Sequence, residues 1–181
     1  MSEQVVAEDG RVEMTDLTVS ARADIDPERV YRALSDLSTN MTWAGSMHSK
    51  KDFGLLTMEA PEGPPRVGTE FRSTGIDPMG RFSDRSVVTE ATDPSVFEFV
   101  TEGHLDPKRR KKASDTRIVY RFELSPDGSG SSVAYRVHLS RWTNPPAMLR
   151  SRLLQPVARL AMKRYAKRML SNLIAYAAGE R

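Results

Sequence analysis

Alternation of apolar and polar residues indicates that most of the chain forms β-strands. The alternation is clear from Leu17 to Ala23, which is typical of a half-buried strand. We expect six further strands, the first of them weaker than the rest, at 53–58, 69–74, 81–91, 96–102, 116–124 and 132–139. In the last two segments one face is apolar and the other is charged. This pattern favours an antiparallel sheet that is covered on one side only.

Helical patterns lie in two places. After the first strand, Asp26 is a good N-cap and Pro27 suits a first helical position, so a short helix is expected there. A second short helix or turn follows over 37–45. Near the end of the chain, apolar residues recur at helical spacing from Ala158 to Tyr176. We expect this long helix to begin near an Asn144 cap, and we expect Pro156 to kink or break it.

The order of elements predicts an α+β fold. A one-sided sheet needs a cover on its apolar face, and the C-terminal helix is the only expected element long enough to supply it. We therefore expect a curved antiparallel sheet of about seven strands wrapped around a long C-terminal helix, with two short helices after the first strand. One domain over 11–181 is expected, preceded by a flexible tail over 1–10. A wedge between sheet and helix would be left for side chains or a ligand to fill.

Composition narrows the class of protein. The chain of 181 residues is 39% hydrophobic and 28% charged, as in ordinary globular proteins. It has no run of about 20 apolar residues of the kind that spans a membrane. The first ten residues carry three acids and no apolar stretch, which argues against a secretory signal. The absence of cysteine excludes disulfides and thiol chemistry and favours a cytoplasmic location.

Several phrases of the sequence resemble the START-like helix-grip superfamily (SRPBCC), in particular its polyketide cyclase/dehydrase and lipid-transport group. They are IDPERVYRALSDLSTNMTWAG, RVGTEFRSTG, VVTEATDPSVFEFV and the closing helix after LSRW. The resemblance runs from about Val12 to Gly179. It implies a helix-grip fold with a cavity for apolar or amphipathic small molecules. The family includes lipid carriers, quinone-binding proteins, hormone receptors and aromatase/cyclases.

The loop around Lys108–Lys112 holds five consecutive basic residues: Lys108, Arg109, Arg110, Lys111 and Lys112. Hairpins of an antiparallel meander alternate between the two ends of the sheet, so this loop should share an end with 75–80 and 141–144. The family resemblance places the cavity mouth at that end, with Arg141 close by. The loop is then either simply solvated or a docking surface for an anionic membrane or an acidic carrier protein. Nucleic acid is the least supported partner, because no aromatic residue interleaves the run.

Charge is distributed unevenly along the chain. Residues 141–181 contain nine Lys/Arg and one acid, a net charge of +8, and the remaining 18 basic and 23 acidic residues sum to −5. Such a split is typical of a protein with one basic face. A solvated helix whose basic side chains cover apolar surface explains it equally well.

Catalytic and cofactor motifs are not found. His48, His104 and His138 lack ligand spacing, so no metal site and no cofactor is expected. No nucleophile elbow, phosphate-binding loop or dinucleotide fingerprint is present. Catalysis without a fixed motif stays open, because an aldol cyclisation can rest on positioning and on hydroxyls that polarise a carbonyl.

Residues on the inward stripes are the candidate ligand-cavity lining. They are Tyr31, Trp43, Phe71, Phe97, Phe99, Tyr120, Phe122, Tyr135, Val137, Trp142, Met162, Tyr165, Met169 and Asn172. The tyrosines among them, with Asn172 and Tyr176, are the candidates for a cyclase-type role. Each is also explained as a core residue. The sequence thus leaves three alternatives: a binding or transport protein for a lipid, quinone or polyketide, a polyketide aromatase/cyclase, or an interaction module whose interior is filled by its own side chains.

Overall fold

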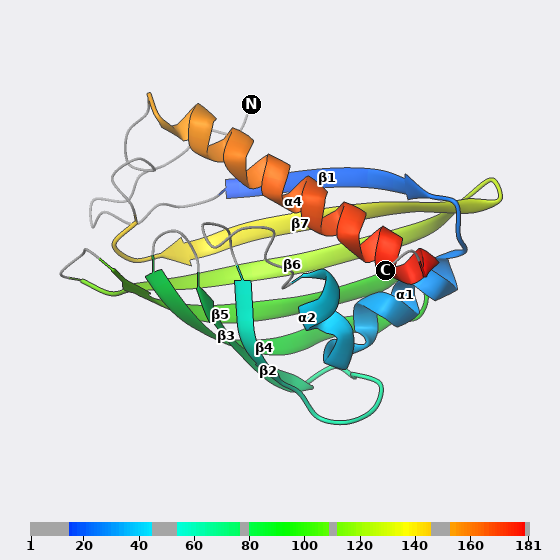
Figure 1. Ribbon diagram of the computed structural model, residues 1–181, viewed down its shortest axis with the longest axis horizontal. Helices are drawn as coiled ribbons and strands as arrows, with labels where there is room; N and C mark the ends of the chain where they lie inside the picture. Colours follow the sequence, from blue (N-terminus) through cyan, green and yellow to red (C-terminus); the bar gives the residue numbers. More distant parts are fainter. Residues whose placement is uncertain (1–14, 45–53, 77–79, 109–111, 146–152, 180–181) are drawn as a thin grey trace.

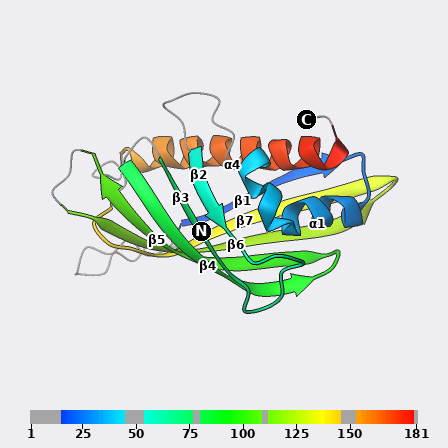
Figure 2. The same ribbon diagram turned by 60° about the horizontal axis from the view of Figure 1, so that its bottom comes forward.

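The computed structural model describes residues 15–44, 54–76, 80–108, 112–145 and 153–179, and in these ranges it shows the expected α+β architecture. A long helix lies along one side of a curved sheet, with the short helices at the end where the long helix terminates (Figures 1 and 2). Among the described residues, no helix is long and apolar enough to cross a membrane. The proposed tail over 1–10 lies outside the described residues.

The sheet has seven antiparallel strands in the order β1-β7-β6-β5-β4-β3-β2, which confirms the predicted count and arrangement. From β2 to β7, each strand pairs with the strand that follows it in the sequence, and β1 pairs with β7. The strands are β1 (Thr15–Ala23), β2 (Gly54–Glu59), β3 (Glu70–Ile76), β4 (Gly80–Thr92), β5 (Val96–Pro107), β6 (Ser114–Asp127) and β7 (Gly130–Trp142).

The two short helices form as the sequence predicts. Helix α1 (Pro27–Ser35) begins where the Asp26 side chain accepts a hydrogen bond of 2.7 Å from the Arg29 backbone amide. A single 3₁₀ turn (Leu37–Thr39) and α2 (Asn40–Trp43) follow. Helix α1 buries its apolar stripe, including Tyr31, and contacts the last turns of the long helix.

The long helix, α4, spans Gln155–Ala178, and its start differs from the prediction. Pro156 does not interrupt α4, because it lies in the first turn, where its missing amide hydrogen has no intrahelical partner to lose. Asn144 does not cap it. Asn144 has a φ of 50°, and its side-chain amide donates to the Ala113 carbonyl. The helix ends at Gly179, whose φ of 82° is the left-handed conformation that glycine adopts most easily.

Three chain connections lie at one end of the sheet, as the meander argument predicts. Gly80 at the start of β4 pairs with Pro107 at the end of β5, and Thr116 near the start of β6 pairs with Trp142 at the end of β7. Helix α4 begins at this same end (Figure 1). We call it the α4-start end of the molecule.

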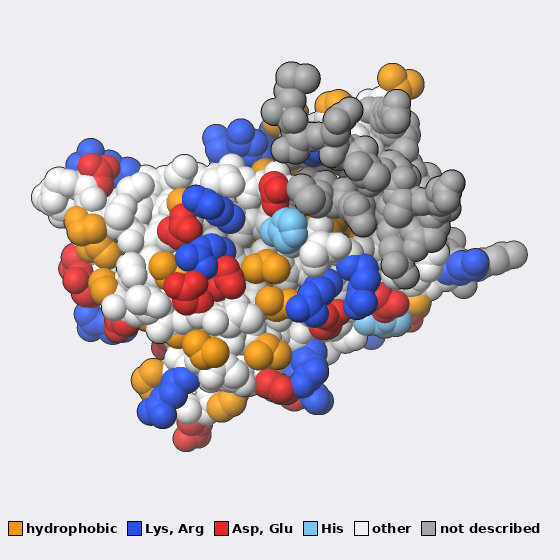
Figure 3. Space-filling view, turned by 180° about the vertical axis from the view of Figure 1, so that it is seen from behind, with side chains coloured by type: hydrophobic (Ala, Val, Ile, Leu, Met, Phe, Trp, Pro, Cys, Tyr) orange, Lys and Arg blue, Asp and Glu red, His pale blue; other side chains and the backbone are white. Residues whose placement is uncertain are grey.

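The convex face of the sheet carries interleaved charges (Figure 3). Arg121 on β6 lies 2.6 Å from Glu90 on β4 and 2.9 Å from Glu98 on β5, and its Nε lies 2.9 Å from Glu123. Hydrogen bonds to these carboxylates, led by Glu123, raise the pKa of Arg121 above its usual range. The apolar side chains therefore belong to the concave face, under α4.

Candidate functional site

Aromatic side chains form a continuous surface on the concave face of the sheet. Ring centroids of Phe71 and Phe99 lie 5.3 Å apart, and those of Phe99 and Tyr120 lie 5.1 Å apart. The rings of Tyr120 and Tyr135 are nearly parallel at 6.3 Å, and Phe122 stacks on Tyr135 at 4.5 Å. The register explains this row, because these inward positions lie opposite or diagonal to one another across β3 to β7.

One end of this surface is packed core and the other is accessible. Phe97 and Phe122 are fully covered, as is Leu173 in the last turns of α4. Phe99 and Tyr120, one inward position farther toward the α4-start end on their strands, are only half-buried. The interior is therefore filled beside α1, and accessible aromatic surface begins under the first half of α4.

Three phenol groups converge where the packed core ends. Burial, and secondarily the charge of Asp84, raises the pKa of Tyr120 well above its usual value. Burial raises the pKa of Tyr135 and Tyr165 too, and Tyr165 adds a smaller electrostatic effect on both of the other phenols. Tyr165, which lies on α4, has 41% of its surface exposed. All three groups are neutral hydrogen-bond donors at physiological pH.

The hydroxyls of Tyr120 and Tyr135 have no hydrogen-bond partner within the described ranges. A buried phenol usually finds such a partner. In the described part of the chain, the fully buried side-chain atoms without a hydrogen-bond partner belong to Trp43 and Ser131. The hydroxyl oxygens of Tyr120 and Tyr135 are not among them, so neither is completely covered by protein. Tyr120 is half-buried and Tyr135 is 3% exposed, so the Tyr120 side chain is the more accessible of the two donors.

A polar row crosses the same face nearer the α4-start end. Ser73, Asp84, Gly103 and Thr116 lie opposite one another on β3, β4, β5 and β6. A Cβ at Gly103 would lie 2.8 Å from Asp84 Oδ1 and 2.6 Å from Thr116 Oγ1, so glycine leaves room for both oxygens. This row is not evident from the sequence, because its members face one another only once the strand register is known.

The next row toward the core contains a buried hydroxyl pair. Ser86 Oγ and Thr101 Oγ1 lie 2.8 Å apart, and both residues are almost fully buried. Their mutual hydrogen bond satisfies both groups. The concave face thus grades from polar to aromatic along the direction of the strands.

Both tryptophans of the candidate lining are packing residues. Trp142 donates from its ring nitrogen to Ser114 Oγ at 2.6 Å and fixes the end of β7 against β6. Trp43 is buried, and its backbone carbonyl accepts a hydrogen bond of 3.3 Å from Asn172. Asn172 therefore holds α2 against α4.

Other candidate residues are distributed between the core and its edge. Tyr31 packs edge-on against Phe97 with centroids 6.2 Å apart, and Met169 is buried in the core. Val137 is half-buried beside Tyr120. Met162 lies at a different place, between α4 and β1.

The candidate docking residues are only partly described. Lys108 and Lys112 are exposed, and residues 109–111 lie outside the described ranges. Arg141 lies on the convex face, where its guanidinium is 2.9 Å from Glu102. Its charge is therefore partly compensated, whereas those of Lys108 and Lys112 have no ion-pair partner among the described residues.

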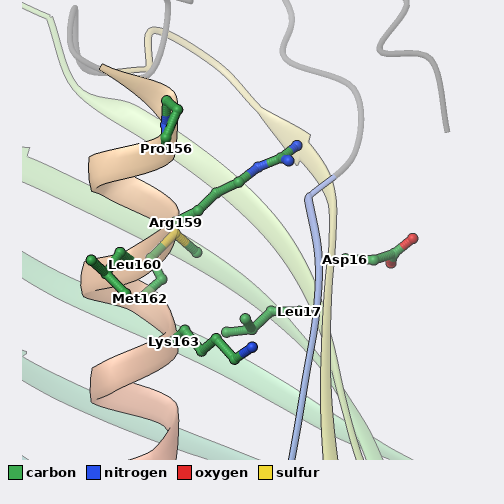
Figure 4. A pocket seen from close by; sticks show the side chains of 7 residues that line it. All are labelled: Asp16, Leu17, Pro156, Arg159, Leu160, Met162 and Lys163. Atoms are coloured by element: carbon green, nitrogen blue, oxygen red, sulfur yellow. The ribbon is translucent and has the colours of Figure 1, made fainter. Parts of the chain in front are cut away.

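A recess of about 370 Å³ opens between the first half of α4 and β1 (Figure 4). Leu17, Leu160 and Met162 supply apolar surface, and Arg159 and Lys163 extend from the helix on the side of β1. This recess is not evident from the sequence, because it depends on how the helix crosses the edge strand.

The described histidines are on the convex face and are paired. His104 Nδ1 lies 2.7 Å from Asp115, and His138 Nδ1 lies 2.6 Å from Asp16. In the described part of the chain, no group of three His, Cys, Asp or Glu side chains is placed to hold a metal ion. His48 lies outside the described ranges.

Comparison with known proteins agrees with this architecture. The family model for polyketide cyclase/dehydrase and lipid transport matches residues 14–178. A protein from Rhizobium leguminosarum has a similar structure, with 15% identity, a TM-score of 0.63 and coverage of 93% of this chain and 97% of that one. TTHA0849 from Thermus thermophilus has 18% identity, a TM-score of 0.62 and coverage of 92% and 99%.

A third similar structure is that of Ara h 8.0201, with 10% identity, a TM-score of 0.58 and coverage of 92% and 99%. These identities establish a shared fold alone. No curated protein matches the sequence significantly. The family model covers nearly the whole chain, and the sheet, the long helix and the two short helices are those of the helix-grip fold. The chain therefore belongs to the polyketide cyclase/dehydrase and lipid transport family, within the START-like helix-grip superfamily.

Proposed function

We propose that the protein binds an apolar or amphipathic small molecule, such as a lipid, quinone or polyketide, between the sheet and the first half of α4. Membership of the family implies a small hydrophobic ligand. The observation that carries the proposal is the aromatic surface that stays accessible at Phe99 and Tyr120 and ends in the hydroxyls of Tyr120 and Tyr135, which have no hydrogen-bond partner among the described residues. We place this activity in the cytoplasm, in keeping with the cysteine-free sequence.

The gradient along the concave face suits a ligand with two unlike parts. Apolar surface buried against Phe71 and Phe99 contributes about 25 cal/mol per Å². The neutral hydroxyls of Tyr120 and Tyr135 would donate to a carbonyl or hydroxyl oxygen of the ligand. Each such bond contributes about 1 kcal/mol to the affinity for the ligand. A plain hydrocarbon would leave these hydroxyls without a partner and would therefore bind more weakly.

Native mass spectrometry of protein purified without detergent tests this proposal. A stoichiometric small molecule, identified after organic extraction, is the expected result. The apo protein is then mixed with a quinone and with an alkane of similar size. Binding of neither, together with an apo mass after purification, would contradict the proposal and favour an interior filled by the protein's own side chains.

A polyketide aromatase/cyclase is the second candidate, and the convergence of three neutral phenols favours it. A phenol that donates to a ketone polarises it for attack by an enol carbon of the same chain, which forms a C–C bond, and dehydration then releases water. Holding the chain folded supplies much of the rate. Turnover of a poly-keto thioester mimic that falls in Tyr120→Phe, with binding retained, would establish this function.

The basic loop is proposed as a docking surface for an anionic membrane or an acidic carrier protein. Lys108 and Lys112 flank it at the α4-start end, and both are exposed. Lys/Arg side chains near an anionic leaflet contribute about 1 kcal/mol each. Such a surface would bring the accessible end of the concave face toward the source of the ligand.

A further inference from the structure

Large apolar side chains are exposed in the first turns of α4 and in the turn just before the helix. Leu153 is 88% exposed, Val157 61% and Leu160 50%. Val157 and Leu160 are three residues apart and lie on the same side of the helix, and Leu153 lies in the turn directly before it. Ala158, on the other side of the helix, is buried. A single exposed leucine is ordinary, but three large apolar side chains gathered at one helix start mark an interaction surface. We call these three residues the apolar tip.

Uncompensated positive charge surrounds and follows the apolar tip. Helix α4 contains five Lys/Arg and no acidic residue. Four of these side chains are exposed and form no ion pair with a described residue, and we call them the α4 cations: Arg159, Lys163, Arg164 and Lys167. Arg164 continues the outward face seven residues after Val157, which is about 10 Å along the helix. Several cations of the convex face, by contrast, are paired with carboxylates, among them Arg121 and Arg141.

The recess between α4 and β1 adds an apolar floor beneath two of these cations. Arg159 and Lys163 are four residues apart and extend toward β1, over the surface of Leu17 and Met162 (Figure 4). A lipid phosphate held by the two cations could place the upper part of its acyl chain against this floor. The recess of about 370 Å³ is too small for a whole lipid, so the remainder of the chain would stay in the bilayer.

We propose that the first half of α4 docks on an anionic lipid surface, with the apolar tip in the interface and the α4 cations on the lipid phosphates. An interfacial segment buries its apolar side by about 5–10 Å, so the tip can enter the interface while Lys163, Arg164 and Lys167, which follow it along the helix, stay level with the lipid phosphates. An acidic protein would satisfy the cations but leave the outermost residues, which are apolar, without a partner.

The docking of α4 does not require a ligand on the concave face. Only the purpose of docking, which is the transfer of a ligand between that face and the lipid, rests on the proposed function. Leu160 borders the recess against β1, but no tip residue belongs to the aromatic surface proposed to bind the small molecule, so substitution of the tip should leave retention of that molecule in native mass spectrometry unchanged. Loss of vesicle binding with the small molecule retained, or the reverse, therefore separates the two proposals.

Vesicle flotation tests the docking. The protein is expected to float with vesicles of equal parts phosphatidylcholine and phosphatidylglycerol at low salt, and not with phosphatidylcholine alone. Leu153→Ser/Val157→Ser/Leu160→Ser should lower the partition coefficient at least about tenfold. The control is Leu56→Ser/Val67→Ser, which removes apolar side chains of similar exposure, 49% and 67%, outside α4. Failure of the wild type to float, or equal flotation of the triple variant, overturns the proposal.

Insertion can also be followed at one residue. Val157→Trp should show a blue-shifted emission and quenching by brominated lipids when anionic vesicles are added, because this side chain enters the interface. The native tryptophans, Trp43 and Trp142, are buried and provide a constant background. Leu56→Trp is the control and should not respond. An unchanged emission from Val157→Trp would overturn insertion.

Discussion

Phe99 and Tyr120 lie opposite each other on β5 and β6, with ring centroids 5.1 Å apart, where the concave face changes from packed core to accessible surface. The neighbouring pair on the core side, Phe97 and Phe122, is fully covered. One step along the strands therefore separates residues that hold the fold together from residues free to contact a ligand. Changes on the two sides of this boundary should have different consequences.

Replacement of Tyr120 by Phe should weaken ligand binding while leaving stability nearly unchanged. Its hydroxyl has no protein partner among the described residues, so its loss should change the free energy of unfolding by less than about 0.5 kcal/mol. A ligand that accepts a hydrogen bond from it should bind about fivefold more weakly. Titration calorimetry with the molecule identified by extraction, alongside urea unfolding, gives both numbers.

Tyr176→Phe is the matched control, because this phenol is on the α4 stripe beside α1 and packs against the filled part of the core. It should leave ligand affinity unchanged. Equal losses in both variants would mean that the effect spreads through the helix and that the Tyr120 hydroxyl does not contact the ligand.

Gly103→Ala should disturb the polar row. The added methyl would lie within 2.8 Å of both Asp84 Oδ1 and Thr116 Oγ1, closer than van der Waals contact allows. We expect a loss of about 1–3 kcal/mol in the free energy of unfolding. Thr116→Ala removes one of the two oxygens, so the double variant should recover part of the loss in a double-mutant cycle. If the changes in the free energy of unfolding of the two single variants add strictly, the side chains at positions 103 and 116 do not contact each other.

Neutralising the basic loop should lower the affinity for anionic vesicles at low salt. Replacing Lys108 and Lys112 by Gln removes two exposed charges without described partners, at about fivefold in affinity each. Arg141→Gln is the comparison, since Glu102 already compensates that charge at 2.9 Å, and its effect should be smaller. Unchanged flotation of the double Lys variant would remove the loop from the docking surface.

Much of the fold is readable from the sequence because alternation and caps are local signals. Asp26 and Pro27 mark the start of α1 correctly. The predicted strands are shorter than the observed ones where pairing with neighbouring strands, rather than the local sequence, extends the strand. The segment 103–107 reads as a turn because of its Gly and Asp-Pro, yet it continues β5 because β4 and β6 pair with it on both sides. The start of α4 was misplaced because the prolines near 145 and at 156 are both plausible start signals.

The candidate site is predictable only in part. The aromatic residues follow from strand phase alone, so Phe99, Tyr120 and Tyr135 were identified. The polar row was missed because the register that brings Asp84 beside Gly103 is a property of the paired sheet. The apolar tip of α4 was missed for a similar reason, since which helix face is covered depends on how α4 packs on β1.

Raising the pH should destabilise the protein through its buried phenols. The pKa of Tyr120, Tyr135 and Tyr165 is raised in the folded state, whereas an unfolded phenol titrates near 10.0. Their contribution to stability is therefore fully present below pH 10 and falls above it, because only the unfolded chain loses these protons. Ionisation of the almost fully buried Tyr135 in the unfolded chain should lower the free energy of unfolding by about 1.4 kcal/mol per pH unit beyond that point, whereas Tyr165, which is 41% exposed, should contribute less because water screens it.

Urea unfolding between pH 9 and 11 measures this slope, with the pH values chosen to bracket the ordinary pKa of tyrosine. Lysines titrate in the same range, so the difference between wild type and Tyr135→Phe isolates one phenol. The variant should lose stability less steeply, by about 1.4 kcal/mol per pH unit above pH 10. Identical slopes would mean that Tyr135 ionises as easily in the folded protein as in the unfolded chain. Its hydroxyl would then be as well solvated as in the unfolded chain, which would contradict the burial of Tyr135 in the core.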